Sequence, residues 1–165
     1  MSRAGRTDDP TDVLGILAKR PGKWQHDRAN IPLGAAMNAI GWAAVAAGGA
    51  LGAVTRYGVA QWLSHAAHKG EFPWATLLVN VVGTAILATL AGLSWSERGL
   101  SPTANLLLGT GFCGALTTFS TFSVEAVALW RAGHGTTALA YVGASLALCF
   151  AVAAVLIGTL APPGR

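Results

Sequence analysis

Charged residues are scarce in this chain: Lys, Arg, Asp and Glu make up 11% of its 165 residues, whereas hydrophobic residues make up 53%. Soluble domains carry about 25% charged residues, and a water-soluble chain of this size needs a more polar surface. The composition therefore excludes an ordinary soluble domain and indicates that lipid surrounds most of the chain. The 21 glycines agree with this interpretation, because small residues let membrane helices approach closely.

The few charges are concentrated near the N-terminus. Residues 1–30 hold six of the eleven Lys and Arg and four of the seven Asp and Glu. Nucleic-acid binding needs a basic face, and this tail has mixed charge, so the net charge of +4 does not predict a nucleic-acid partner. Residues 1–33 show no sustained periodicity and no apolar stretch long enough for a secretory signal, which predicts a disordered polar arm.

Cysteine is equally rare in the sequence. Cys113 and Cys149 both fall inside apolar stretches. Such residues are usually small buried hydrophobes, so we do not expect them to form a disulfide or a metal-binding pair.

Four long apolar segments follow the arm. Each can cross a hydrocarbon core of about 30 Å, which needs roughly 20 helical residues. The segments lack strand alternation, and only helices and closed barrels satisfy every backbone group in lipid. The predicted fold class is an all-α membrane protein with four transmembrane helices in residues 34–161. The predicted segments are Leu33–Leu63, Pro73–Leu93, Thr103–Trp130 and Thr136–Leu160.

Basic residues are nearly balanced between the two sides of the predicted helices. One side carries Arg98 and Arg165 outside the arm, and the other carries Lys69 and Arg131, with Arg56 nearby. Because basic residues favour the inner side of a membrane, a balanced core can insert in both orientations. The six basic residues of the arm favour an inner N-terminus, so the sequence leaves the orientation open.

Hydroxyl side chains and glycines interrupt the third segment between Gly109 and Glu125. Polar groups at this depth are costly and often functional, and a broken helix is tolerated only where it is buried in protein or lines a cavity. A break would free carbonyls that can coordinate a cation. The alternative is a kinked packing helix whose hydroxyls bond to their own backbone, and the pattern leaves both open.

Two phenylalanines stand in the same run. Phe119 and Phe122 are three residues apart and therefore share a helical face. Aromatic rings have a positive edge, which can face an anion. Simple core packing is the commoner explanation for two phenylalanines on an apolar helix.

Polar side chains recur at helical spacing on the neighbouring segments. Thr76 and Asn80 are four residues apart on the second segment, and Tyr141 and Ser145 are four apart on the fourth. These side chains could form a polar track through the membrane. An interhelical hydrogen bond is the alternative role of Asn80, and in lipid such a bond contributes about 0.6 kcal/mol on average.

Two ionisable residues, Arg56 and Glu125, lie near segment ends, where they can also simply reach the interface.

A small dual-topology multidrug or cation exporter remains an alternative, although such a protein would need an early mid-membrane carboxylate that the first segment lacks. An enzyme is not expected, because no segment pairs a nucleophilic hydroxyl with a buried base.

Three motifs of the chain resemble those of the Fluc/CrcB fluoride channel family. They are Gly48–Tyr57 (GGALGAVTRY), Thr76–Gly83 (TLLVNVVG) and Gly111–Phe122 (GFCGALTTFSTF), and with the fourth helix they cover about residues 37–160. The resemblance implies a small channel that passively exports fluoride across the bacterial plasma membrane and so limits its toxicity. It also implies an antiparallel dual-topology dimer with two pores.

The resemblance further implies roles for individual residues. Main-chain carbonyls of Gly114 and Thr117 would hold a structural Na⁺ at the dimer centre. Arg56 would lie near a vestibule and Glu125 near the outer end of the polar track. Fluoride would meet ring edges, an amide and hydroxyl groups along the pore. The matching residues are Phe119, Phe122, Asn80, Thr76, Thr118, Ser120, Tyr141 and Ser145.

The N-terminal arm is longer than this family's core requires. Its six basic residues oppose equal insertion in both orientations. Some members of the family work as paired chains of fixed, opposite orientation. A homodimer and a heterodimer with an opposite-orientation paralogue therefore both remain open.

Overall fold

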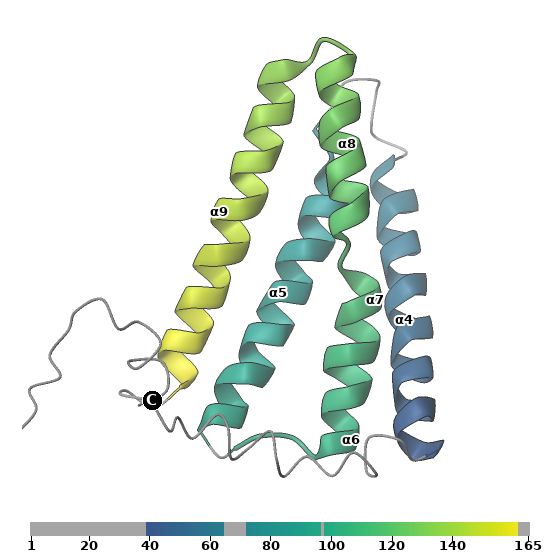
Figure 1. The fold of residues 1–165 in the computed structure, drawn as a ribbon, viewed down its shortest axis with the longest axis vertical. Helices are drawn as coiled ribbons and strands as arrows, with labels where there is room; N and C mark the ends of the chain where they lie inside the picture. The colour runs from purple at the N-terminus through teal and green to yellow at the C-terminus, as the bar shows by residue number, and fades with distance from the viewer. Residues whose placement is uncertain (1–38, 65–71, 97, 162–165) are drawn as a thin grey trace, which may run out of the picture. The chain divides into compact units, whose positions relative to one another are not determined.

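The computed structural model describes residues 39–64, 72–96 and 98–161. The predicted arm, residues 1–33, lies outside the described residues. Four helical spans are long and apolar enough to cross a membrane, which confirms the predicted fold class. Three of them are the unbroken helices α4 (Ala39–Ser64), α5 (Trp74–Trp95) and α9 (Gly135–Leu160) (Figure 1).

The third span is interrupted, as predicted. Thr117 and Thr118 between its two halves are extended, with ψ of 155° and 116°. The glycines before them do not break the helix; the chain there takes a wider, π-helical form. In order, the pieces are α6 (Pro102–Asn105), the π-helix η1 (Leu106–Cys113), α7 (Gly114–Leu116) and α8 (Phe119–Arg131).

The break has a local cause. Threonine is β-branched, which lowers its helix propensity, and its hydroxyl competes for backbone groups. The Thr117 hydroxyl donates to the carbonyl of Cys113 over 2.9 Å. The Thr118 hydroxyl accepts from the N–H of Thr121 over 3.2 Å and so caps the first turn of α8.

The first half of the third span packs closely against α4 (Figure 1). A Cβ atom on Gly48 would overlap the carbonyl oxygen of Leu107, and one on Gly52 would overlap that of Phe112. The glycine at Gly111 faces α4 in turn, where a Cβ atom would lie 2.8 Å from the Val45 carbonyl oxygen. Glycine is therefore required at this contact by close backbone approach, as in other membrane helix pairs.

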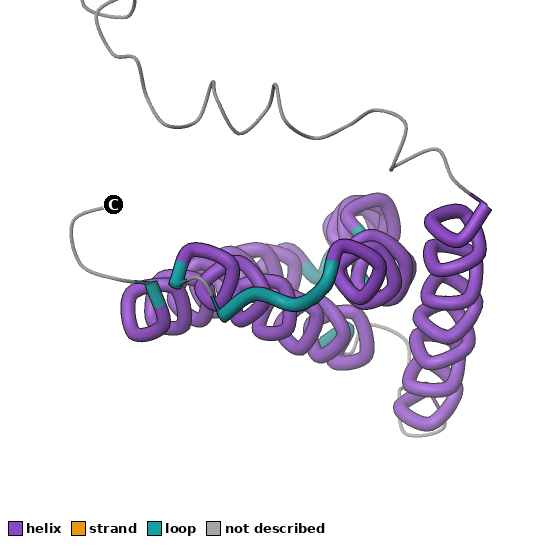
Figure 2. The backbone as a smooth tube through the Cα atoms, turned by 90° about the horizontal axis from the view of Figure 1, so that it is seen from below, coloured by secondary structure: helices purple, strands orange, loops and turns teal. Residues whose placement is uncertain are grey.

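The second half packs instead against α9, which also lies along α5. A small apolar core joins these helices, with Phe122 packed against it, and consists of Leu77, Leu129, Ala138 and Tyr141. Seen from below, the described residues form helices and short loops, with no strand among them (Figure 2).

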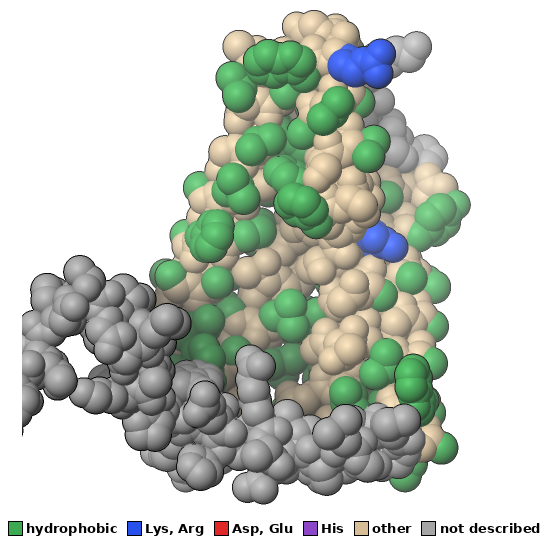
Figure 3. Space-filling model, viewed as in Figure 1, with side chains coloured by type: hydrophobic (Ala, Val, Ile, Leu, Met, Phe, Trp, Pro, Cys, Tyr) green, Lys and Arg blue, Asp and Glu red, His purple; other side chains and the backbone are tan. Residues whose placement is uncertain are grey.

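Most of the surface of the spans is apolar. Among the coloured side chains of Figure 3, hydrophobic groups extend over the whole visible face and basic groups occupy only small areas. Exposed tryptophans stand near the helix ends, where such side chains anchor membrane helices at the interface. Trp62, Trp74 and Trp130 lie toward one end, and Trp42 and Trp95 toward the other.

Candidate functional site

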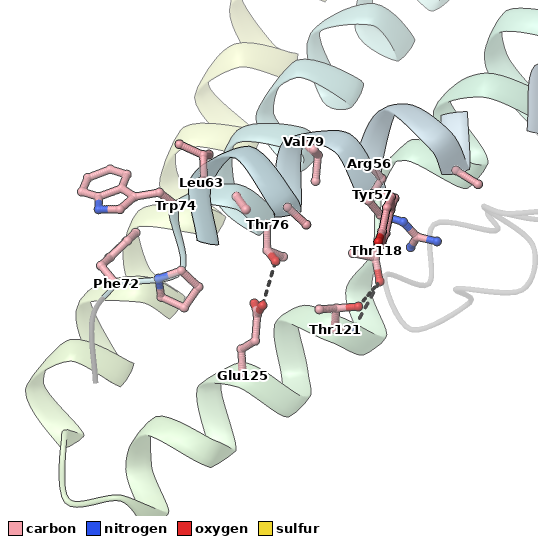
Figure 4. A pocket seen from close by; sticks show the side chains of 14 residues that line it. Arg56, Tyr57, Leu63, Phe72, Trp74, Thr76, Val79, Thr118, Thr121 and Glu125 are labelled. Atoms are coloured by element: carbon pink, nitrogen blue, oxygen red, sulfur yellow. Dashed lines mark hydrogen bonds between the residues drawn. The ribbon is translucent and has the colours of Figure 1, made fainter. Parts of the chain in front are cut away.

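A cavity of about 510 Å³ opens between α4, α5 and α8 (Figure 4). Its wall contains polar side chains from all three helices, although most of its lining is apolar. These side chains include both ionisable residues that the sequence places near segment ends. The polar lining consists of Arg56, Tyr57, Thr76, Thr118, Thr121 and Glu125.

The Glu125 carboxylate joins three helices in this region. Its Oε1 accepts a hydrogen bond of 2.9 Å from the Thr76 hydroxyl, and its Oε2 accepts one of 2.7 Å from the Tyr141 hydroxyl. Figure 4 shows Thr76 and Glu125 pointing toward each other across the cavity. The structure thus brings together three residues that the sequence placed on separate segments.

Asn80 forms a two-bond clamp on the broken helix. Its Oδ1 accepts the N–H of Thr118 over 2.8 Å, and its Nδ2 donates to the Thr118 carbonyl over 3.2 Å. The interhelical hydrogen bond considered for Asn80 is therefore present. An amide nitrogen carries two hydrogens and Thr118 uses one, so the same side chain can still donate to another acceptor.

Two main-chain carbonyls at the break have lost their helical partners. In a continuous α-helix, each carbonyl accepts from the N–H four residues later. The N–H of Thr118, the partner of the Gly114 carbonyl, donates to Asn80 instead. The N–H of Thr121, the partner of the Thr117 carbonyl, donates to the Thr118 hydroxyl. These are the carbonyls that the resemblance implies for a cation.

Oxygen donors of this kind fit an alkali cation, which takes main-chain carbonyls as ligands in interrupted membrane helices. Gly114 is exposed on the single chain and Thr117 is half-buried. In the described part of the chain, no group of three or more His, Cys, Asp or Glu residues offers a side-chain metal site. The freed carbonyls are thus the donor set that suits a cation here.

A second cavity, of about 270 Å³, lies on the side of the break toward α9. Phe119 is 78% exposed, so core packing within this chain does not explain it. Its ring lies 5.7 Å from that of Phe122, which in turn lies 5.1 Å from that of Tyr141. The lining consists of Asn80, Thr84, Leu87, Thr117, Thr118, Phe119, Phe122, Ser145, Leu146 and Cys149.

The Ser145 hydroxyl is the unsatisfied group of this second cavity. Ser145 is 6% exposed, and its Oγ has no hydrogen-bond partner among the described residues. A buried hydroxyl without a partner costs about 1–3 kcal/mol. An anion or a water molecule in the cavity would accept its proton and remove that penalty.

Tyr141 connects the two cavities. It is fully buried, its hydroxyl binds Glu125 at the first cavity, and its ring packs against Phe122 at the second. Among the predicted pore residues, Tyr141 and Ser120 are the two that line neither cavity. Ser120 is exposed, and its hydroxyl lies 3.3 Å from that of Thr118.

Sequence reasoning missed two residues of the second cavity, Cys149 and Thr84. Cys149 lies four residues after Ser145 and eight after Tyr141, and Thr84 lies four after Asn80. The signal that finds them is the continued four-residue spacing, which keeps side chains on one helical face. Both cysteines are free thiols, with Cys113 buried and Cys149 only half-buried.

Comparison with known proteins adds a family match. Residues 43–159 match the family described as CrcB-like protein, Camphor Resistance (CrcB). The chain is 49% identical over 109 residues, 66% of its length, to the Fluoride-specific ion channel FluC 2 of Rhodococcus jostii, of which 89% is covered. It is 41% identical over 123 residues, 74% of its length, to the Fluoride-specific ion channel FluC of Saccharophagus degradans, of which 90% is covered.

A third relative is also named as a fluoride-specific ion channel. The chain is 44% identical over 119 residues, 71% of its length, to the Fluoride-specific ion channel FluC 2 of Bacillus subtilis, and 86% of that protein is covered. The family match, over residues 43–159, covers nearly all of the four spans and begins after the start of α4.

Proposed function

The chain belongs to the CrcB family, and we propose on that premise that it is a fluoride-selective channel of the bacterial membrane. It is a multi-pass membrane protein and not an enzyme. Passive export of fluoride through it lowers the fluoride concentration of the cytoplasm. The main support for this proposal is the cavity on the α9 side of the break, because two aromatic rings, an amide and a hydroxyl without a partner line it.

Fluoride is small and holds its hydration water tightly, so a pore must replace that water with donors. Ring edges carry partial positive charge, and hydroxyl and amide hydrogens are direct donors. Phe119, Phe122, Asn80 and Ser145 provide these groups in one cavity. A larger anion such as chloride is stabilised less by a few closely spaced donors than fluoride is. Ion size and the number of donors are therefore the basis of selectivity.

The first cavity has a lining that suits the entrance, or vestibule, of the pore. Its wall carries the positive charge of Arg56 and the carboxylate of Glu125, and a positive charge such as that of Arg56 attracts anions. Thr76 and Tyr141 hold both oxygens of Glu125, so this carboxylate has two donors directed at it. Thr118 lines both cavities, so an anion moving between them would pass this residue.

The exposed surfaces at the break support an antiparallel dimer. Phe119 is 78% exposed, and Gly114 is exposed beside it; a second copy that covers them would close the pore wall. Among described residues, the basic charge is close to balanced, with Arg98 toward one end and Arg56 and Arg131 toward the other. This balance suits insertion in both orientations. A paralogue of opposite orientation could take the place of the second copy.

A structural Na⁺ is the cofactor that fits the freed carbonyls. The carbonyls of Gly114 and Thr117 would hold it, together with the same carbonyls of the second copy. When bound, the cation supplies positive charge that satisfies oxygens otherwise unpaired within the membrane.

Fluoride efflux from liposomes tests the proposal. Purified protein alone is reconstituted into liposomes loaded with potassium fluoride or potassium chloride, a potassium ionophore is added, and the released anion is followed with a selective electrode. We expect fast fluoride efflux and no chloride efflux, which also means that one chain type suffices. If well-folded protein, reconstituted alone, releases neither anion, the homodimeric channel is rejected; release of both rejects fluoride selectivity.

A further inference from the structure

The peptide unit of Thr118 is held from outside its own helix. Both its N–H and its carbonyl bind the Asn80 side chain of α5. Thr118 itself is 8% exposed, so water does not compete for these groups in the described structure. The Asn80 amide therefore determines where the peptide of Thr118 points, and it keeps the N–H away from the Gly114 carbonyl.

The side chain of Thr118 redirects a second backbone N–H, that of Thr121. Its hydroxyl oxygen accepts the N–H of Thr121 over 3.2 Å and donates to the Thr121 hydroxyl over 3.0 Å. This N–H would otherwise bind the Thr117 carbonyl in a continuous helix. One residue thus contributes to freeing both carbonyls, through its backbone for Gly114 and through its side chain for Thr117.

Backbone carbonyls without a hydrogen-bond partner are unfavourable within a membrane unless neighbouring side chains keep the helix open and a ligand binds the carbonyl oxygens. Each unsatisfied backbone group there costs several kcal/mol. A helix that lost the Asn80 clamp and the Thr118 cap would regain these bonds by closing the break. The two side chains therefore oppose helix closure, and a cation that binds the freed carbonyls opposes it too.

We infer that Asn80 and Thr118 are positioning residues for the cation site and that Asn80 couples this site to the anion path. Asn80 lines the second cavity while its amide holds the peptide that frees the Gly114 carbonyl. Cation affinity thus depends on a side chain of the pore wall. The inference rests on the cation site of the proposed function.

Thermal unfolding without fluoride tests this inference. The melting temperature of the full-length protein in detergent is measured while NaCl replaces choline chloride at constant ionic strength. The variants are Asn80→Leu and Thr118→Val, which remove the clamp and the cap. Thr118→Ser keeps the hydroxyl and is the conservative variant. Thr89→Val is the matched control on α5, because the Thr89 hydroxyl binds only its own helix, at the Ala85 carbonyl.

Na⁺ should raise the melting temperature of the wild type to a plateau, because a ligand of the native state stabilises it. Loss of a group that orients metal ligands lowers affinity on the order of 10- to 100-fold. The half-saturating Na⁺ concentration should therefore rise by that factor in Asn80→Leu and Thr118→Val. It should stay unchanged in Thr118→Ser and Thr89→Val. If Asn80→Leu does not fold, the two substitutions at Thr118 still decide the question.

A variant that merely destabilises the protein lowers the melting temperature equally in Na⁺ and in choline and leaves the half-saturating concentration unchanged; that result overturns the inference. Absence of any Na⁺ response in the wild type overturns it as well. Fluoride efflux is measured separately on the same wild-type protein. Efflux without a Na⁺ response leaves the channel function intact and removes the inference, whereas the reverse result keeps the inference and removes the function.

Discussion

The two halves of the third span are held by different interactions. Before the break, η1 packs on α4 through glycines, with backbone close to backbone. After the break, α8 is held by side-chain interactions: Glu125 accepts hydrogen bonds from Thr76 and Tyr141, and the ring of Phe122 packs against that of Tyr141. Close backbone packing thus holds the half before the break, and hydrogen bonds between side chains hold the half after it.

This difference explains where the proposed function lies. A close glycine contact excludes water and leaves no cavity for an ion. The polar half has long side chains with donors between the helices, so cavities remain beside them. Substitutions in the first half should therefore damage the fold, whereas substitutions in the second half should mainly alter the passage of ions.

The largest effect is expected from Gly48→Ala. A methyl group there would overlap the Leu107 carbonyl, and overpacking against an unyielding backbone costs about 3 kcal/mol. Most of the variant should aggregate or melt early, as seen by size-exclusion chromatography and thermal unfolding. Gly58→Ala is the control, because a Cβ atom at Gly58 meets nothing within 4 Å. Equal stability of the two variants would contradict the close contact.

Phe119→Ile should strongly reduce fluoride efflux and leave the fold intact. The Phe119 side chain is 78% exposed, so its loss removes little packing in the chain. Hydrogen bonds to charged groups contribute about 1.5–3 kcal/mol; if a ring edge that replaces such a bond contributes as much, efflux falls by about 10- to 100-fold. Val127→Ile, at another exposed position of α8, is the control for liposome efflux. Phe122→Ile should reduce efflux similarly, and unchanged efflux in both variants would remove the ring-edge role.

Tyr141→Phe tests the hydrogen bonds of the polar half. The change leaves Glu125 Oε2 without its 2.7 Å donor but keeps the ring against Phe122. Because hydrogen bonds to charged groups contribute about 1.5–3 kcal/mol, the free energy of unfolding should fall by about that amount. Denaturant unfolding of Tyr141→Phe beside Thr89→Val measures it. A loss no greater than that of Thr89→Val would mean that the carboxylate contact is energetically unimportant.

The smallest expected effect is a difference in thiol labelling between the two cysteines. Cys113 in the packed half is fully buried, whereas Cys149 lines the second cavity and is half-buried. A small thiol reagent should therefore label Cys149 in the folded protein and leave Cys113 unlabelled, as read by mass spectrometry of peptides. Cys149→Ser should abolish labelling without changing stability. Labelling of Cys113 under native conditions would show that the packed half opens.

Several features could be predicted from the sequence because they depend on local composition. Apolar length alone predicts the four spans. The glycines and hydroxyl residues of the third span leave a break and a kink both open, and the structure has a break. The four-residue spacing of Tyr141 and Ser145, and of Thr76 and Asn80, predicts shared faces. The motifs at Gly48–Tyr57, Thr76–Gly83 and Gly111–Phe122 predict the family.

The tertiary structure alone decided which of these faces meet. Hydrogen bonds from Asn80 to Thr118, 38 residues apart, and from Thr76 to Glu125, 49 apart, depend on helix packing that no local pattern encodes. The break likewise fell not at the glycines but at the threonines, where Asn80 of α5 holds the peptide of Thr118. Sequence determines what each helix can offer, whereas packing determines which donor meets which acceptor.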